Sequence, residues 1–314
     1  MRTADTPTAI DKATKHSSSS SCNSTPAHNS TPARAASHTA GQVVFLTGAS
    51  SGIGKSTAIM LHNAGLKVYA AARRVECMQD LRALGIVVLY LDLLKNESIE
   101  ACVQEVLRQE GRIDVFVSNA GYGFYGAIED VPLESARAQL DVNLFGFARL
   151  VQLIAPSMRA QNHGKIIAIS SIAGRVWTPF GGWYHASKYA LEGLCDSLRL
   201  ELKPFGIDVI LIEPGGIKTD WGVIAARHLR EISSNGAYAK SCEKYARALH
   251  QTYQGSSLSS PDTIARTIIT AIHAKRPKTR YLVGFMARPM LYARRVLGDR
   301  LFDRLIAFAW GRSW

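Results

Sequence analysis

Several features that mark common protein classes are missing from this sequence. Its five cysteines are scattered, odd in number and without a CxxC pair, which argues against a disulfide framework and for a reducing compartment. The nine histidines show no metal-ligand spacing such as HExxH, so we expect no catalytic metal. No apolar run approaches the roughly 18 residues of a membrane span, and the N-terminus lacks the apolar core of a secretory signal. We therefore expect a cytoplasmic protein.

Residues 1–41 are polar and of low complexity, with Ser, Thr, Ala and Pro prominent between Ser17 and Ser37. Nothing in this segment can bury a core, so it is predicted to be a disordered extension. Acidic residues are few, as in organelle transit peptides, but arginines are few too. A cytoplasmic location is therefore favoured over an organelle.

The formal net charge is +12, and much of the excess lies near the C-terminus, where ten Lys or Arg from Lys275 onward accompany only Asp299 and Asp303. Such a segment could meet nucleic acid or an anionic membrane, but a solvated helix face is the commoner explanation, and we expect no nucleic-acid partner. Residues 287–314 are predicted to form a basic amphipathic helix. It could make peripheral membrane contact, or dock over the substrate pocket or a partner subunit. Docking on protein is favoured, because terminal helices often close a core.

Apolar runs alternate with helical patterns after Gly41. The runs occupy 43–48, 67–73, 86–92, 113–121, 165–171, 207–215 and 280–284, and the helical patterns occupy 52–64, 96–110, 132–160, 183–204 and 262–275. Because the runs are almost continuously apolar, both faces of the strands should be covered, as in a parallel sheet. The sequence predicts one doubly wound α/β domain over 42–286, with a seven-stranded, mainly parallel sheet. The strandless insertion at about 216–260 is predicted to be a helical lid over the substrate rather than a plain surface excursion.

A glycine-rich turn joins the first strand to the first helix. It has the pattern TGxxxGxG, in which glycines let the backbone turn tightly and approach a pyrophosphate. The N–H groups and dipole of the following helix attract the same phosphates. The expected dinucleotide-binding residues of this turn are Thr47, Gly48, Ser50, Ser51, Gly52, Ile53 and Gly54.

The end of the second strand distinguishes the two nicotinamide dinucleotides. An NAD site places Asp or Glu there to bond the ribose 2′-hydroxyl, whereas this chain has Arg73 and Arg74. Because a guanidinium suits a 2′-phosphate, we expect NADP(H), although a solvated arginine in an unselective site would leave the same pattern. Asp92, after the third strand, could meet the adenine side of the cofactor or cap the next helix.

Tyr184 and Lys188 lie four residues apart in an expected helix and so share one face. A free phenol has a pKa of about 10, and a nearby positive charge favours its ionised form. At ~4 Å and an effective dielectric of ~20, one charge supplies about 4 kcal/mol, enough to bring that pKa to about 7. The pair is thus predicted to make Tyr184 a proton donor or acceptor near neutral pH. His185 points about 100° away and is expected to pack.

Taken together, these motifs resemble the short-chain dehydrogenase/reductase family. The matching segments are TGASSGIG at 47–54, NAG at 119–121, DVNLFG with Asn143, ISS with Ser171, YHASK at 184–188 and PGGIKT at 214–219. NAGYGFYG and EPGGIKTDWG further resemble the hydroxysteroid and retinol dehydrogenase-like branch. The resemblance implies a Rossmann domain in which hydride passes directly between nicotinamide and substrate carbon while Tyr184 moves the proton.

The resemblance also implies roles for single residues. Ser171 would hydrogen-bond the substrate oxygen, Lys188 would also hold the nicotinamide ribose, and Asn143 would position a water that connects Lys188 to solvent. Thr219 would touch the nicotinamide carboxamide, and Asn119 would brace the sheet beside the cofactor. The motifs add Ala120, Gly121, Pro214, Gly215 and Ile217 to the expected cofactor site. Family members commonly pair through the helices expected at 132–160 and 183–204, so a homodimer or homotetramer is expected.

Aromatic residues gather in the sequence near these motifs. The expected substrate-site residues are Tyr122, Phe124, Trp177, Phe180, Trp183 and Trp221. A nearly uncharged wall suits an apolar ligand, so we expect an oxidoreductase of a hydrophobic ketone or aldehyde and its alcohol, of steroid, retinoid or lipid kind. Two alternatives are a reductase of small aliphatic or aromatic carbonyls and a non-catalytic NADPH-binding regulator. The complete Ser–Tyr–Lys–Asn set argues against the regulator.

Overall fold

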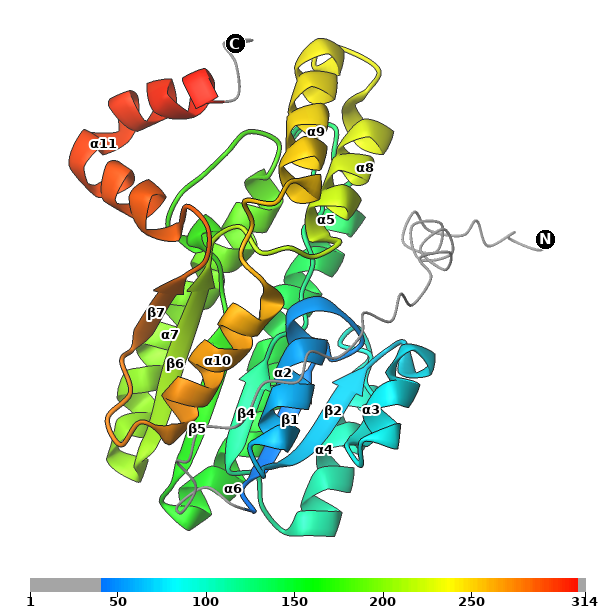
Figure 1. Cartoon of the computed structure of the whole chain (residues 1–314), viewed down its shortest axis with the longest axis vertical. Helices are drawn as coiled ribbons and strands as arrows, with labels where there is room; N and C mark the ends of the chain where they lie inside the picture. Colours follow the sequence, from blue (N-terminus) through cyan, green and yellow to red (C-terminus); the bar gives the residue numbers. More distant parts are fainter. Residues whose placement is uncertain (1–40, 310–314) are drawn as a thin grey trace, which may run out of the picture.

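Seven parallel strands form the centre of the computed structural model, which describes residues 41–309 (Figure 1). They are β1 (Val43–Thr47), β2 (Lys67–Ala72), β3 (Val87–Tyr90), β4 (Val115–Ser118), β5 (Gly164–Ile169), β6 (Ile207–Pro214) and β7 (Arg280–Val283). Their order is β3-β2-β1-β4-β5-β6-β7, and every pairing along it is parallel. This confirms the predicted doubly wound sheet. The disorder predicted for residues 1–41 lies, apart from Gly41, outside the described residues.

Helices cover both faces of the sheet (Figure 1). One face carries α2 (Gly52–Asn63), α3 (Gln79–Ala83) and α10 (Pro261–His273), and the other carries α4 (Asn96–Glu110), α6 (Gly146–Gln161) and α7 (Gly182–Leu202). Alternate residues of β1 enter the two cores: Phe45 faces α4 and α6, whereas Leu46 faces α2 and α10. Because both faces are covered, the strand is fully buried, which explains its unbroken apolar sequence.

The helix predicted over 132–160 is present as one continuous helical run with a π-helical turn inside it. It consists of α5 (Leu133–Leu140), a π-helical turn over Asp141–Phe145, and α6. Such a turn inserts one extra residue into a helix, and π-turns often occur at functional sites. Here the turn carries Asn143, which is 3% exposed.

The insertion after β6 forms two helices that lie side by side and rise above the carboxyl end of the sheet (Figure 1). They are α8 (Trp221–Ser233) and α9 (Ala239–Gln254), joined by an ion pair of 2.7 Å between Arg230 and Glu243. The two ends of the insertion meet, because Ile217 and Ser259 form a parallel bridge. We call residues 218–258 the lid.

The C-terminal helix, α11 (Ala287–Ala309), follows β7 and forms an arm beside the lid (Figure 1). A kink at Gly298, which has φ of 64°, divides it into two halves. Phe302 and Ile306 in its second half pack on Val176, in the segment before α7. Among residues 41–309, no helix has the length and apolar character that crossing a membrane requires.

Candidate active site

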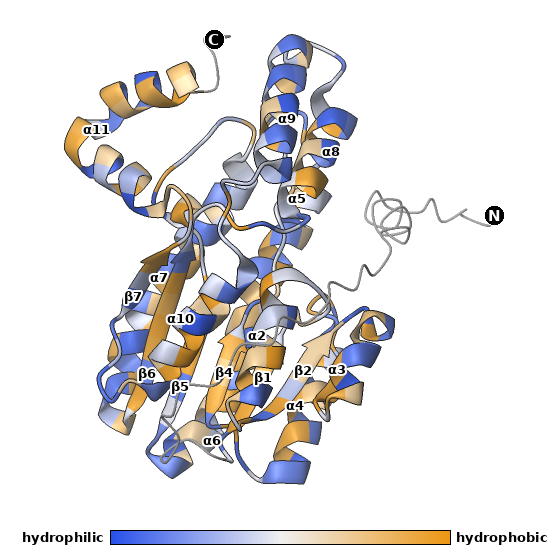
Figure 2. Ribbon diagram, in the orientation of Figure 1, coloured by the Kyte–Doolittle hydropathy of each residue, from blue (hydrophilic) through white to orange (hydrophobic). Residues whose placement is uncertain are grey.

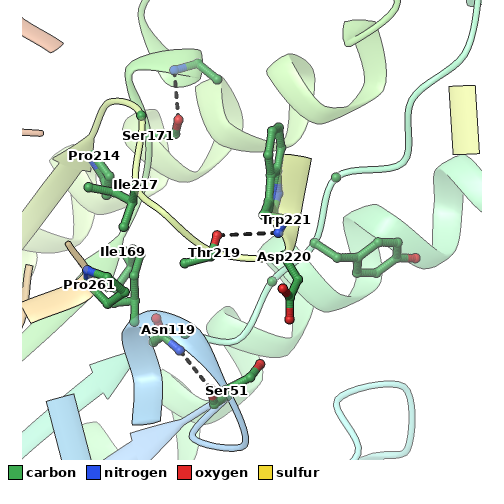
Figure 3. Close-up of a pocket in the computed structure, with 18 of the residues that line it drawn as sticks. Ser51, Asn119, Ile169, Ser171, Pro214, Ile217, Thr219, Asp220, Trp221 and Pro261 are labelled. Atoms are coloured by element: carbon green, nitrogen blue, oxygen red, sulfur yellow. Dashed lines mark hydrogen bonds between the residues drawn. The ribbon is translucent and has the colours of Figure 1, made fainter. Parts of the chain in front are cut away.

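A cleft of about 2900 Å³ opens at the carboxyl end of the strands, between the sheet, the lid and α11. The strand order reverses between β1 and β4 beneath it, and such switch points are where doubly wound sheets bind ligands. Figure 3 shows Ser51, Asn119, Ser171, Thr219 and Trp221 around this cavity, although they come from separate segments of the chain. Of the predicted cofactor and catalytic residues, the lining includes Gly48, Ser50, Ser51, Gly52, Ile53, Arg73, Arg74, Asp92, Asn119, Ala120, Gly121, Ser171, Tyr184, Lys188, Pro214, Gly215, Ile217 and Thr219.

The glycine-rich turn is closely packed against the end of β1 and Asn119. A Cβ on Gly54 would lie 2.2 Å from the carbonyl oxygen of Gly48, so no larger residue fits there. The turn is fixed from below, because the Asn119 amide donates to the carbonyl oxygens of Thr47 and Gly48 at 3.1 Å. Thr47 Oγ1 in turn accepts from the backbone N–H groups of Asn119 and Ala120. This bare backbone at the start of α2 fits the pyrophosphate of a dinucleotide.

The two arginines after β2 lie beside this turn. Arg74 Nη2 is 3.4 Å from the hydroxyl oxygens of both Ser50 and Ser51, and Arg73 is exposed in the cleft. This end of the cleft is therefore cationic, which fits an additional phosphate. Asp92 lines the cleft as well, but its Oδ1 accepts from the N–H of Leu94 at 3.1 Å, so it also shapes the turn before α4.

The predicted acid–base pair is deeply buried. Burial raises the pKa of Tyr184 to about 12, and a hydrogen bond with Ser171 offsets this only in part. Lys188 Nζ lies 6.0 Å from the Tyr184 ring centroid and donates to the carbonyl oxygen of Ile169 at 2.9 Å. Burial lowers the pKa of Lys188 to about 8, whereas the nearby Glu192 raises it. The prediction that Lys188 alone brings the Tyr184 pKa to about 7 is wrong for the chain by itself, because desolvation of the phenol outweighs an ammonium at this distance.

Asn143 joins the π-turn to the segment that follows NAG. Its Nδ2 donates to the carbonyl oxygen of Tyr122 at 2.9 Å and to Ser187 Oγ at 3.0 Å, and its Oδ1 accepts from the Tyr122 N–H at 3.0 Å. A Cβ on Gly121 would lie 3.0 Å from Asn143 Oδ1 and 3.7 Å from Lys188 Nζ. Asn143 is therefore a neighbour of Lys188 that also holds the cleft wall in place.

His185 does more than the predicted packing. Its Nε2 accepts from the Thr178 N–H at 3.0 Å, while Nδ1 lies 3.0 Å from the carbonyl oxygen of Ala173. Since a carbonyl can only accept, Nδ1 carries the proton and the ring is neutral. Burial lowers the pKa of His185, which keeps it neutral. The imidazole thus ties the segment 173–178 to the start of α7, next to Tyr184.

Only half of the aromatic residues predicted to contact substrate line the cleft. Tyr122, Phe124 and Trp221 do, and the Trp221 ring lies 5.2 Å from that of Tyr184. The lid also contributes Tyr253, whose ring is 5.8 Å from Trp221 and which the sequence analysis missed. Its position on the apolar side of an amphipathic helix was the available signal.

The other three aromatic residues are corrections to the prediction. Trp177 packs edge-on against Phe302 of α11, with ring centroids 5.2 Å apart. Phe180 packs beneath the lid at 5.6 Å from Tyr245, and Trp183 packs against the core around Phe124. These side chains support the walls of the cleft from behind.

A buried charged cluster beneath the site was also missed. Arg280 of β7 reaches Glu192 of α7 at 2.9 Å and Glu213 of β6 at 3.1 Å, and Arg175 reaches Glu213 at 3.2 Å. Burial and the nearby Glu192 carboxylate raise the pKa of Glu213 to about 7. The cluster joins β6, β7 and α7 directly before the Pro214–Thr219 segment. In residues 41–309, no group of three or more His, Cys, Asp or Glu side chains could hold a metal ion.

Comparisons with known proteins agree with this site. The family model of short chain dehydrogenases matches residues 42–227. The chain is 35% identical to 3-ketodihydrosphingosine reductase of Bacteroides thetaiotaomicron, over 77% of this chain and 88% of that protein. It is also 35% identical to estradiol 17-beta-dehydrogenase 1 of Rattus norvegicus, over 76% of this chain and 72% of that protein.

Among solved structures, a metagenomic short-chain oxidoreductase in complex with NADP superposes with a TM-score of 0.63. It is 29% identical in sequence, and the match covers 79% of this chain and 98% of that one. The motifs, the doubly wound sheet, the glycine cradle and these similarities agree with one another. The chain belongs to the short-chain dehydrogenase/reductase family, whose members are oxidoreductases that act on CH–OH groups with a nicotinamide cofactor.

Proposed function

We propose that this protein is an NADP(H)-dependent oxidoreductase that interconverts an apolar ketone or aldehyde and its alcohol, with Tyr184 as acid–base. One observation carries the proposal: Ser171, Tyr184 and Lys188 share one wall of a cleft that also contains the glycine cradle and an apolar lid. A protein that only senses a dinucleotide needs the cradle but not a buried phenol and ammonium at the far end. The proposal therefore favours catalysis over the regulatory alternative.

The side chains can perform the proton transfer of a reduction. The bound nicotinamide would supply hydride to the carbonyl carbon. The side chains of Ser171 and Tyr184 are hydrogen-bonded to each other. Both hydroxyl groups would donate hydrogen bonds to the carbonyl oxygen of the substrate, and Tyr184 would give that oxygen its proton as negative charge develops there. Burial raises the pKa of Tyr184 to about 12, so the phenol carries its proton at neutral pH in the chain without cofactor. The Lys188 ammonium would stabilise the resulting phenolate.

The preference for NADP(H) rests on the arginines after β2. Arg73 and Arg74 present two guanidinium groups beside the cradle, where a 2′-phosphate would lie, and charge-assisted bonds to phosphate are stronger than neutral ones. The NADP complex of the metagenomic relative supports this choice.

The apolar substrate rests on the lid. Trp221 and Tyr253 cover the catalytic end of the cleft, and hydrophobic walls with few polar groups suit an apolar ligand. The names of the two curated relatives refer to a sphingoid ketone and a steroid, which are both bulky and apolar. A small aliphatic carbonyl would leave most of this wall without contact.

The test is turnover of purified protein with NADPH or NADH and a panel of ketones that differ in size, followed by nicotinamide absorbance. Tyr184→Phe should lower kcat at least ~100-fold, the usual scale of losing a general acid, and leave NADPH affinity nearly unchanged. Tyr189→Phe, one turn along α7 and 42% exposed, is the matched control. A Tyr184→Phe protein that keeps a tenth of the original kcat would refute the assigned role. NADPH binding without turnover of any ketone would favour the regulatory alternative.

We further propose that two chains pair through α6 and α7, as the family resemblance implies. Phe145 before α6 and Leu200 on α7 are 59% and 67% exposed and would be covered in such a pair. Light scattering on the purified protein measures its mass directly, and a monomer at micromolar concentration would overturn this pairing.

A further inference from the structure

Helix α11 has two apolar sides, of which the protein covers only one. Met290, Ala293, Leu297, Phe302 and Ile306 face the segment before α7. A second set of apolar side chains lies outside that contact: Tyr292 is 65% exposed, Val296 78%, Leu301 49%, Leu305 36% and Phe308 70%. The hydropathy colouring of Figure 2 shows apolar residues recurring along both halves of the arm. Single exposed apolar residues are common on protein surfaces, but five large ones on one helix form a patch of the kind that marks a binding surface.

The exposed charge on the same helix is mostly positive. Arg288, Arg295, Arg300 and Arg304 are exposed and make no ion pair with any residue in 41–309.

The two carboxylates of α11 are already engaged. Asp299 pairs with Arg294 at 2.6 Å, and Asp303 accepts from the Trp177 indole at 2.8 Å. The five arginines of the described helix outnumber its two aspartates, which leaves α11 a net charge of +3.

Around the helix, the packed side, the exposed apolar side chains and the arginines follow one another in the same order before and after the kink at Gly298. At about 100° per residue, Tyr292 and Val296 lie between the packed side and Arg295 in the first half. In the second half, Leu301 and Phe308 likewise lie between the packed side and the arginines. An apolar strip with arginines along one edge suits a helix that lies in a membrane interface, where the cationic ends reach the headgroups.

The same helix forms one wall of the cleft. Pro289, Met290 and Ile306 line it, together with Met286 just before the helix and Val223 of the lid. Apolar side chains of α11 therefore line the same cleft as the catalytic groups. A molecule that leaves a bilayer at α11 would contact these side chains as it enters the cleft.

We propose that α11 docks in the interface of an anionic lipid bilayer, so that the cleft opens toward the acyl chains and takes a lipid-derived carbonyl compound. Anionic phosphates complement the four unpaired arginines, whereas a second copy of this helix would present the same positive charge. The bilayer is therefore a better occupant of this surface than a second chain. The choice of substrate rests on the proposed function, but the docking of α11 does not.

Flotation of the full-length protein with vesicles tests the docking. Phosphatidylcholine vesicles with about a third phosphatidylserine should carry the protein, and pure phosphatidylcholine vesicles should not. Replacing Arg295, Arg300 and Arg304 by Gln removes about 1 kcal/mol each near an anionic surface, which corresponds to ~100-fold weaker binding. Salt near 1 M, where the Debye length is about 3 Å, should also release the protein.

Two matched control variants test whether binding depends on α11 itself, and not on the total charge of the protein or on exposed apolar residues elsewhere. Replacing Lys275, Arg276 and Lys278 by Gln removes the same charge at the loop before β7, at the opposite end of the sheet (Figure 1), and should leave binding within about twofold.

The apolar strip is tested in the same way. Val296→Ser with Phe308→Ser should release the protein, while Leu84→Ser with Tyr90→Ser, exposed near the distant edge strand β3, should not. Neither Val296 nor Phe308 lines the cleft, so the turnover of a water-soluble ketone should be unchanged.

Several outcomes would overturn the docking. Equal flotation on neutral and anionic vesicles would mean that the arginines of α11 do not bind the bilayer. Equal loss of flotation in the α11 arginine variant and in the variant of Lys275, Arg276 and Lys278 would mean that α11 is not the binding surface. No flotation, together with a dimer that the Val296→Ser, Phe308→Ser variant loses in light scattering, would assign the strip to a second copy. Flotation without turnover of any ketone would instead refute the proposed function and leave the docking intact.

Discussion

Replacing Glu213 by Gln tests the buried charged cluster beneath the active site. Glu213 is 1% exposed, and its carboxylate contacts Arg175 and Arg280 but also lies close to Glu192. Burial, followed by the charge of Glu192, raises its pKa from 4.5 to about 7. Glutamine keeps the size and shape of the protonated acid but cannot ionise.

The sign of the effect follows from linkage. A carboxyl group whose pKa is higher in the folded chain than in the unfolded chain adds stability below pH 4.5, and this stability is lost as the pH rises through about 7. At 1.36 kcal/mol per pKa unit, this group alone should cost the folded protein about 2–3 kcal/mol between pH 5 and pH 8. The Gln variant lacks this loss, so its unfolding free energy should rise relative to the original protein by about that amount over the same interval.

Urea unfolding followed by tryptophan fluorescence at pH 5, 6, 7 and 8 measures the difference. Because the comparison is made between two proteins at each pH, the titration of groups remote from Glu213 cancels, and the difference reports Glu213 together with its neighbour Glu192. Glu201→Gln, at an exposed position on α7, controls for the loss of one carboxylate. If the pH dependence of the Glu213→Gln protein ran parallel to that of the original protein, the reasoning about this cluster would be refuted.

Three further predictions concern the cofactor and α11. Gly54→Ala puts a Cβ 2.2 Å from a backbone carbonyl oxygen of the same turn. Calorimetry should therefore find nicotinamide dinucleotide binding at least ~10-fold weaker, while the far-UV circular dichroism spectrum is unchanged. Unaltered affinity would mean that the cofactor binds elsewhere. Arg73→Ala with Arg74→Ala should weaken NADPH by about 2–4 kcal/mol and affect NADH much less, and equal KM values for the two cofactors in the original enzyme would contradict this. Phe302→Ala removes a fully buried ring, worth about 3 kcal/mol, and should make α11 sensitive to limited proteolysis; the exposed Phe308→Ala is its control, and equal cleavage of both would mean that α11 is not held by that ring.

Elements buried on both faces were predictable from the sequence. All seven strands were located. Five of them are almost wholly buried and therefore apolar throughout, whereas β3 and β7 are only partly buried. The helix over 96–110 was placed with the correct bounds, since its apolar side recurs with helical spacing. The order of the motifs was enough to place the cofactor end of the cleft, because parallel strands bring their carboxyl ends to one edge.

What the sequence could not supply depends on side-chain placement. A π-turn adds one residue without disturbing composition, so the turn at Asp141–Phe145 is invisible to a periodicity argument. Trp177, Phe180 and Trp183 lie close to Tyr184 along the chain, but each packs in a different apolar cluster behind the cleft wall. Phe180 also has a left-handed backbone, with φ of 62°. The prediction that the pKa of Tyr184 is lowered was wrong for a related reason. An argument from residues i and i+4 includes the charge of Lys188 but not the burial that the tertiary structure imposes on the phenol.

The bridge between Ile217 and Ser259 has a consequence for how such an enzyme diversifies. Because the two ends of the lid are neighbours, the chain leaves the sheet and returns to it at nearly the same point. Changing the length of a loop whose ends are fixed costs little, about 0.6 kcal/mol per doubling. Insertions, deletions or exchanges between 222 and 258 would therefore leave the cradle, Thr219 and Lys188 in place. New substrate ranges can arise in this segment by recombination, while the chemistry of the reaction is inherited unchanged.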